Sequence, residues 1–396
     1  MGVISRKKQS NSGKKEKKVR RTPKWNVDSM LGSLAVNYDA SVALISGILI
    51  AFGIVMVFSA GYYTTTNFYN DPYYYLRRQL AWVALGIGVM ALFTRWDYHK
   101  YAKYYWVFAV VSVGALALLF TPLGVTVNFA TRWFQLGPLR ITPSEFSKLA
   151  MIIFTAGYVA ERPRRVRTIY VFVLFGVMIV HLGLIIKQPN LSTAIVIAAI
   201  MIGIMYVAGM WNGWLVLAAL ALIGGLIFIL MFYPDSHWYA RMTNFIDPFK
   251  DAQGEGYQVS QGLIALGNGG LFGLGPGKSI TKNLYLPEPQ NDFILAIIGE
   301  ELGFVGLVVL LSVYLLLIYR CFVITVRAKD KLGFYLGAGI TVMMALQVIL
   351  NVAVVTASMP ATGITLPFVS YGGTSLLVFM ASMGIMLNIS KKNRGQ

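Results

Sequence analysis

Long apolar runs recur along this chain, and they restrict its possible folds more than any other feature. Most are about 20 residues long, enough for a helix to cross a bilayer core of about 30 Å. Only 13% of the 396 residues are charged, whereas a soluble protein carries about 25%. In lipid every backbone polar group must be bonded internally, so such runs predict helices. We therefore expect an all-α polytopic membrane protein.

The runs number ten, and the basic residues between them predict their orientation. They cover residues 41–62, 79–95, 104–123, 143–160, 168–187, 191–209, 211–233, 292–318, 332–357 and 369–389. With the N-terminal tail in the cytoplasm, the inner segments hold 24 of the 34 Lys and Arg residues, as the positive-inside rule requires. Ten helices with both termini in the cytoplasm are therefore predicted.

The predicted domain organisation is simple. Residues 1–40 form a basic, disordered cytoplasmic tail, residues 41–390 the ten-helix membrane domain, and residues 391–396 a cytoplasmic C-terminal tail. The net charge is +18, and ten Lys and Arg residues lie in the first 24 positions. This concentration favours a tail beside anionic lipid headgroups. A nucleic-acid-binding arm is the weaker alternative, and we expect no nucleic-acid partner.

Three segments on the predicted outer side differ from simple loops. Residues 124–142 carry two arginines, and residues 234–291 form a long extracellular loop between the seventh and eighth helices. Loops of that size are usually functional or disordered. Residues 358–371, SMPATGITLPFVSY, predict non-helical backbone at membrane depth, which is tolerated where it is buried in protein or lines a cavity. Any site that these segments build opens to the exterior.

Asp292 follows Gln290 and Asn291 and opens the eighth run. A short polar residue at a helix start can cap it by accepting free N–H groups, and Asn291 could supply that cap alone. The alternative is that Asp292 is a general base at the mouth of an outward cavity. We predict Asp292 as the catalytic residue and place Gln290 in the substrate-binding set.

Two further acids, Glu300 and Glu301, lie deeper in the same run, about 12–14 Å further along a helix. Acids inside a membrane are costly and usually pair with another group in the bundle interior. On a helix these two side chains point about 100° apart, so one partner could not easily serve both. A structural hydrogen-bonding role is the favoured interpretation.

The stretch ITPSEFSKLA starts the fourth run and places Glu145 and Lys148 on one helix face. The pair is either a local ion pair that lowers the cost of two buried charges, or a site at which Lys148 holds an anionic headgroup that Glu145 orients. Arg132 and Arg140 lie in the loop before it, and the planar fork of arginine suits phosphate oxygens. Arg132, Glu145 and Lys148 therefore join the predicted substrate-binding set.

Phosphate-loop and zinc signatures are absent from the sequence. GNGGLFGLGPGKS has Phe272 where a phosphate loop needs its first glycine, and its glycines instead favour a loop that folds over a cavity. The three histidines, His99, His181 and His237, are far apart, and with the single Cys321 they form no zinc pattern. We assign no metal ligand and expect no cofactor, with a divalent cation as the alternative.

Four stretches together resemble the SEDS family, named for shape, elongation, division and sporulation. They are GEGYQVSQGLIALGNGGLFG, YLPEPQNDFILAIIGEELGF, PSEFSKLA and TGITLPFVSYGGTS. The similarity covers nearly the whole chain after residue 40. TGITLP and YLPEPQNDF are closer to the FtsW/SpoVE branch than to RodA.

The resemblance implies a ten-span peptidoglycan glycosyltransferase of the bacterial cytoplasmic membrane. Such an enzyme polymerises lipid II, the undecaprenyl-diphosphate-linked disaccharide peptide, beside a class B penicillin-binding protein. The family's essential aspartate maps to Asp292, its acid and lysine of the fourth span to Glu145 and Lys148, and its loop arginine to Arg132. In KQPNLSTA, Asn190 stands where the family commonly has an aspartate, so no acid can act at that position here.

Direct displacement would join two lipid-linked sugars with inversion and without a covalent enzyme intermediate. Asp292 would take the proton of the acceptor hydroxyl, and Arg132 and Lys148 would stabilise the departing lipid diphosphate. Two rivals remain: a flippase for the lipid-linked precursor, although no inverted repeat is evident, and a non-catalytic scaffold that recruits a transpeptidase.

Overall fold

The computed structural model describes Gly2 and residues 39–394, apart from residues 128–129, 138, 215, 218–219, 221–223, 225–244, 246, 251–253 and 255. Residues 39–394 belong to one structural unit, Asn37–Gln396. Nearly all of the predicted basic tail lies outside the described residues.

Every predicted apolar run except 211–233 coincides with a described helix, and that run lies largely outside the described residues. The helices are α2 (Ala40–Tyr69), α3 (Tyr74–Arg95), α5 (Tyr105–Leu118), α6 (Pro143–Glu161), α7 (Val171–Ile186), α8 (Leu191–Val207), α12 (Ile294–Val326), α13 (Lys331–Val355) and α14 (Gly373–Arg394). Shorter helices are α4 (Tyr98–Ala102), η1 (Pro163–Arg167) and α11 (Tyr257–Gly269).

Five of these helices, α2, α3, α12, α13 and α14, are long and apolar enough to cross a membrane, whereas α5, α7 and α8 are apolar but shorter. The predicted helical, polytopic architecture is thereby confirmed, while the number ten stays a prediction. Several helix boundaries differ from the predicted ones, and α12 for example ends at Val326 rather than at 318. α2 runs on to Tyr69, and near its end the hydroxyls of Thr65 and Thr66 donate to carbonyls three or four residues earlier (2.8–3.0 Å). α14 runs on to Arg394, past the predicted boundary at 390.

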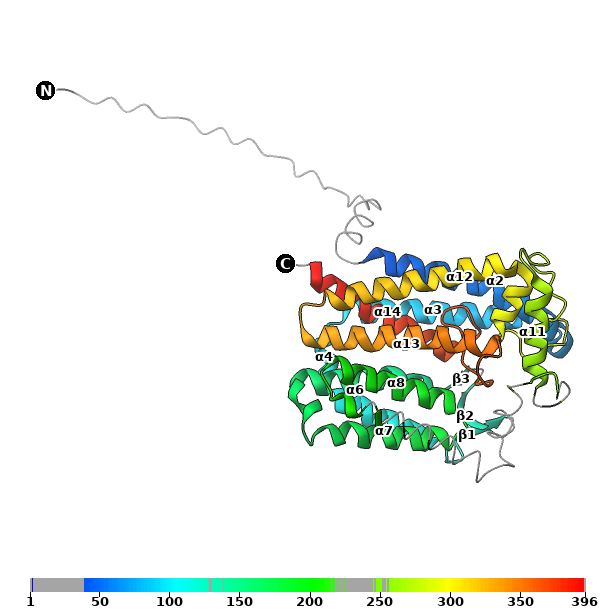
Figure 1. The fold of residues 1–396 in the computed structure, drawn as a ribbon. Coiled ribbons are helices and arrows are strands. Elements are labelled where there is room, and N and C mark those ends of the chain that lie inside the picture. The colour runs from blue at the N-terminus through cyan, green and yellow to red at the C-terminus, as the bar shows by residue number, and fades with distance from the viewer. Residues whose placement is uncertain are drawn as a thin grey trace. The chain divides into compact units, whose positions relative to one another are not determined.

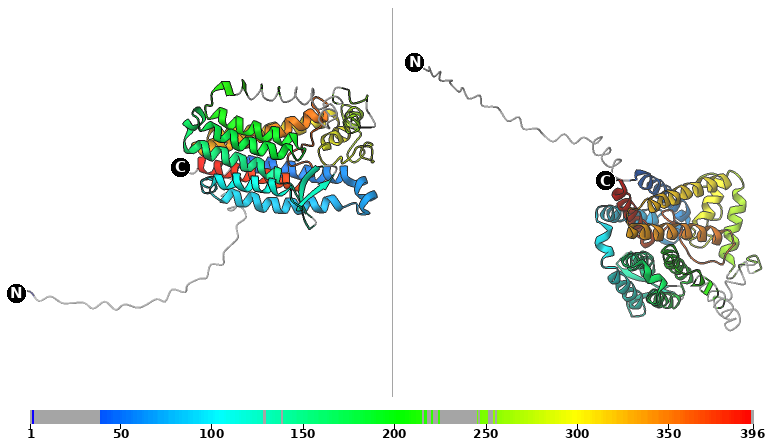
Figure 2. Two further views of the ribbon diagram at one scale, coloured as in Figure 1. Left: turned by 90° about the horizontal axis from the view of Figure 1, so that it is seen from below. Right: turned by 60° about the vertical axis from the view of Figure 1, so that its left-hand side comes forward.

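The helices run roughly parallel and form two groups (Figures 1 and 2). One group holds α2, α3, α12, α13 and α14, and the other holds α5 to α8. α6 is buried along most of its length, because it packs against α5 and α8 on its own side and against α13 and α14 on the other. Its polar side chains therefore face protein rather than lipid.

A small sheet is the one departure from an all-α fold among the described residues. β1 (Gly124–Val127), β2 (Ala130–Leu136) and β3 (Leu139–Ile141) pair antiparallel in the order β1-β2-β3. Val, Thr, Trp and Phe in this stretch favour strands. The sheet lies with α11 at one end of the bundle (Figure 1), which we call the sheet end.

α12 is interrupted at Gly303, whose φ of 69° and ψ of −171° are not helical. The break leaves backbone groups without helical partners, and the glycine-rich residues 270–275 supply them. The carbonyls of Glu300 and Glu301 accept hydrogen bonds from the N–H groups of residues 274 and 275 (2.9 and 3.0 Å). The N–H groups of residues 304 and 305 donate to the carbonyls of residues 270 and 271 (2.9 and 3.1 Å). Residues 270–275 therefore dock closely against α12, while the folding of this loop over a cavity stays a prediction.

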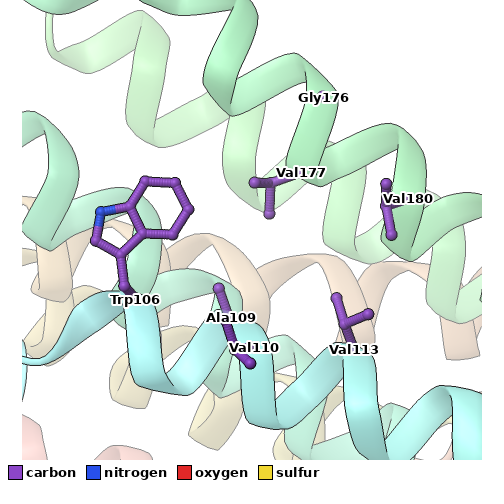
Figure 3. A pocket seen from close by; sticks show the side chains of 7 residues that line it. All are labelled: Trp106, Ala109, Val110, Val113, Gly176, Val177 and Val180. Atoms are coloured by element: carbon purple, nitrogen blue, oxygen red, sulfur yellow. The ribbon is translucent and has the colours of Figure 1, made fainter.

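An apolar groove of about 260 Å³ lies between α5 and α7 (Figure 3). Its lining residues are Trp106, Ala109, Val110, Val113, Gly176, Val177 and Val180. Because none of these side chains carries a charge, the groove suits contact with lipid chains rather than chemistry.

Candidate functional site

Asp292 lies in the turn directly before α12, at the sheet end, and its side chain is half-buried. The helix begins at Ile294 with Phe293 as N-cap, and no side chain caps it by a hydrogen bond. Asn291 does not cap this helix, because its side-chain oxygen has no hydrogen-bond partner among the described residues. Asn291 instead donates from its amide to the carboxylate of Glu288 (2.5 Å).

The predicted irregular segment 358–371 is confirmed: it joins α13 to α14 without regular helix or strand, and it packs beside Asp292. At Gly363, where φ is +71°, an added Cβ would lie 3.8 Å from Asp292 Oδ2. Asn351 of α13 donates both to the carbonyl of Asp292 (2.8 Å) and to that of Ile364 (2.7 Å). One amide side chain thus fixes the Asp292 turn against this segment.

Lys148 is almost wholly buried, with 2% of its surface exposed. Its ammonium lies 2.8 Å from the carboxylate of Glu145 and donates to the side-chain oxygen of Gln347 on α13. The amide of Gln347 in turn donates to the carbonyl of Thr365 in the irregular segment (3.3 Å). The predicted ion pair is therefore present, and a third, unpredicted residue completes it.

Gln347 and Asn351 are one helical turn apart on α13, so they lie on the same face. Through them the Lys148 ion pair and the Asp292 turn are both attached to residues 364 and 365. Sequence reasoning missed both amides. The available signal was two amide side chains four residues apart within an apolar helix, where polar groups are expensive and usually functional.

Arg132 extends from β2 toward the turn between α7 and α8. Its guanidinium donates to the carbonyl of Gln188 (3.0 Å) and to that of Pro189. The next residue, Asn190, caps α8 by accepting from Thr193 N–H (3.3 Å) and lies 3.4 Å from the hydroxyl of Ser144 beside Glu145. Asn190 is therefore a capping residue, and Arg132 is linked to the start of α6.

Several buried oxygen atoms around Asp292 have no hydrogen-bond partner among the described residues. They are the side-chain oxygens of Gln290, Asn291, Asn351 and Thr362. Buried acceptors without donors are costly, and they indicate a ligand or solvent that brings hydroxyl or amide N–H groups. A sugar with an N-acetyl group carries both kinds of donor. Gln290 also accepts from Tyr371 N–H through its carbonyl (2.8 Å).

Within the described part of the chain, no three His, Cys, Asp or Glu side chains gather in a way that would hold a metal ion. The unpaired oxygens around Asp292 belong to amides and hydroxyls, and Asp292 itself is a carboxylate. Mg²⁺ is commonly held by one or two carboxylates together with water and substrate phosphates. A divalent cation held in this way is therefore the alternative to a metal-free site.

Glu300 and Glu301 have separate sets of partners. This agrees with the prediction that their side chains point about 100° apart on the helix. Glu301 pairs with the ammonium of Lys282 (2.8 Å) and accepts from Ser59 (2.6 Å). Glu300 accepts from Asn268 (3.2 Å) and from the N–H and hydroxyl groups of residue 281 (2.9–3.4 Å). Both carboxylates fasten residues 268–282 to α12, which confirms the structural interpretation.

The fold and the site define a polytopic helical membrane protein with an acid, an ion pair and unpaired acceptors at one end. The chain belongs to the cell cycle protein family of FtsW, RodA and SpoVE, whose model matches residues 39–395.

The chain is similar to a probable peptidoglycan glycosyltransferase FtsW of Geobacter sp. strain M18, with 34% identity over 90% of this chain and 98% of the relative. It is 35% identical to stage V sporulation protein E of Bacillus subtilis, over 90% of this chain and 98% of that protein. Among solved structures, a peptidoglycan synthase complex that coordinates polymerization and crosslinking matches with a TM-score of 0.75 and 28% identity, over 91% of this chain and 99% of that one. The rod shape determining protein RodA of Thermus thermophilus matches with a TM-score of 0.66, 27% identity and coverage of 91% and 98%.

Proposed function

We propose that this membrane protein, a peptidoglycan glycosyltransferase, polymerises lipid II at the outer face of the bacterial cytoplasmic membrane with Asp292 as general base. One observation carries the assignment of the site. Asp292 and the Lys148 ion pair are attached, through Asn351 and Gln347, to the same irregular segment at the sheet end. The irregular segment thus holds both an acid for the acceptor sugar and a cation for the diphosphate of the donor.

In the proposed reaction the acceptor hydroxyl oxygen bonds to the anomeric carbon of the donor sugar. The bond from that carbon to the lipid diphosphate breaks, and the electron pair leaves with the diphosphate. Asp292 accepts the hydroxyl proton. Lys148 and Arg132 stabilise the negative charge that grows on the leaving group, and Gln290 accepts a hydrogen bond from the sugar. The displacement inverts the anomeric centre and forms no covalent enzyme intermediate.

The partners and the orientation follow from the same proposal. Similarity to a peptidoglycan synthase complex supports a class B penicillin-binding protein that crosslinks the product strands. The bias of Lys and Arg supports cytoplasmic termini, so that the sheet end faces outward. No organic cofactor is required by a displacement of this kind. Repeating the wild-type assay described below with and without EDTA tests the divalent cation.

Asp292→Asn tests the assignment directly. Asparagine keeps the size of the side chain but accepts no proton at neutral pH, so chain formation from lipid II should fall by about 10²–10⁴-fold. The assay uses purified protein with its partner and measures glycan chains and thermal unfolding. Glu288→Gln, which removes an exposed carboxylate nearby, is the matched control and should retain activity.

Two outcomes would contradict the proposal. Normal polymerisation by Asp292→Asn would exclude the general-base role. A wild-type protein that moves lipid II across vesicles but never lengthens a glycan chain would be a flippase, and one that does neither but activates its partner would be a scaffold.

A further inference from the structure

Aromatic side chains gather where α2 ends and α3 begins, at the sheet end. We name this group the tyrosine platform, and its members are Phe58, Tyr62, Tyr63, Tyr69, Tyr73, Tyr74, Tyr75 and Tyr371. Seven come from α2, α3 and the turn between them, and the eighth, Tyr371, comes from the irregular segment beside the site. The group is therefore shared between the helix ends and the site.

Two of the platform's ring pairs are stacked nearly parallel. Tyr69 and Tyr74 have centroids 4.1 Å apart and planes at 10°, and Phe58 and Tyr73 have centroids 5.6 Å apart and planes at 9°. In each pair one ring is exposed, Tyr69 by 48% and Tyr73 by 54%, while its partner is more buried. Each exposed ring is thus held in position by the ring behind it.

A continuous series of contacts leads from these rings to the candidate site. The ring of Tyr69 touches that of Tyr75 (6.2 Å between centroids), which touches that of Tyr371 (4.8 Å). The N–H of Tyr371 donates to the carbonyl of Gln290 (2.8 Å), two residues before Asp292. The platform therefore begins where the new glycosidic bond is made in the proposed reaction.

A charged side chain lies against the tyrosine platform. The guanidinium of Arg78 lies over the Tyr74 ring, 4.3 Å from its centroid, and a guanidinium carries five N–H donors.

We propose that the tyrosine platform binds the amino-sugar chain that this glycosyltransferase makes and guides it away from Asp292. Pyranose rings present faces of C–H groups, and these pack on the electron-rich faces of aromatic rings. Tyrosine adds a hydroxyl that can bond to the sugar's hydroxyl and amide groups. This inference rests on the polymerase function, since the occupant is its product.

The alternative is a membrane-interface belt, in which tyrosines anchor helix ends at the headgroup level. A belt requires each ring to face lipid. Here the rings stack on one another, and their contacts continue through Tyr371 into the segment that packs beside Asp292. This arrangement favours a ligand that extends from the site.

Binding is tested in the inactive Asp292→Asn background, so that the result does not depend on catalysis. The probe is a series of β-linked oligomers of N-acetylglucosamine, titrated against detergent-purified protein. Tyr69→Ala with Tyr73→Ala should weaken binding about tenfold, as expected for the loss of two stacking rings. Tyr69→Phe with Tyr73→Phe keeps the rings and should bind within about twofold of the parent.

The matched control removes two equally exposed tyrosines elsewhere, Tyr206 and Tyr319, which are exposed by 50% and 58%. Their replacement by alanine should leave binding unchanged. In the active background, the Tyr69→Ala and Tyr73→Ala pair should also shift the product toward shorter chains. Unchanged binding and chain length, with lower thermal stability or membrane insertion, would overturn the proposal in favour of a belt. A wild-type protein that binds the oligomers but makes no chain would overturn the polymerase function instead.

Discussion

At the scale of the residue, Lys148 combines burial with charge. A cation that is 2% exposed needs a partner, because an unpaired charge is poorly solvated inside a protein or membrane. Glu145 supplies the opposite charge at 2.8 Å, and Gln347 occupies a further donor of the ammonium. This arrangement serves a structural ion pair and an anion site equally well, so a test has to separate the two.

A pair of variants separates them. Lys148→Met alone leaves the Glu145 carboxylate without its partner, and removing one member of a buried pair costs about 3–5 kcal/mol. Lys148→Met with Glu145→Gln removes both charges and should recover most of that stability. If Lys148 binds the lipid diphosphate, the double variant stays inactive while its unfolding temperature returns toward that of the wild type. Recovery of both stability and polymerisation would reduce Lys148 to a structural role.

At the scale of the element, the break in α12 makes one glycine indispensable. Gly303 has a φ of 69°, and a Cβ at that position would lie 2.3 Å from the backbone nitrogen of Gly273. Gly303→Ala therefore introduces both backbone strain and a collision with the docked loop, and it should destabilise the protein by at least about 2 kcal/mol.

The control for that variant is Gly114→Ala in α5, where a Cβ would meet nothing within 4 Å. Alanine is the better helix former by about 1 kcal/mol, so this change should leave the unfolding temperature unchanged or raise it. Thermal unfolding in detergent measures both variants. Equal stability of Gly303→Ala and the wild type would mean that the loop does not dock against α12.

At the scale of the whole molecule, the orientation of the chain in the membrane can be measured by labelling introduced cysteines, with little labelling of the native one. Cys321 is the chain's only cysteine and is fully buried, so a membrane-impermeant thiol reagent should not reach it. A cysteine at Ile280, which is 55% exposed, should react in intact cells, whereas one at Arg164 should react only after the membrane is opened. Reaction of both positions from the same side would break the predicted topology.

The helices and the main site residues could be predicted because their signals are local. An apolar run of sufficient length specifies a helix by itself, and Glu145 and Lys148 meet because they lie one turn apart on one helix. The docking of residues 270–275 and the attachments made by Gln347 and Asn351 depend on segments that are further apart in the chain. No local pattern states which distant carbonyl an amide will reach.

The docking of residues 270–275 onto α12 also has a consequence for biosynthesis. In the predicted topology the loop, which is synthesised before α12, has already crossed the membrane when Glu300 and Glu301 enter it. Until the loop closes on the helix, the two acids lack Lys282, Asn268 and residue 281, and the carbonyls at the break lack their donors. Lipid supplies no replacement for these partners. The eighth predicted span therefore completes its insertion together with the translocated segment that precedes it, as one coupled step of assembly.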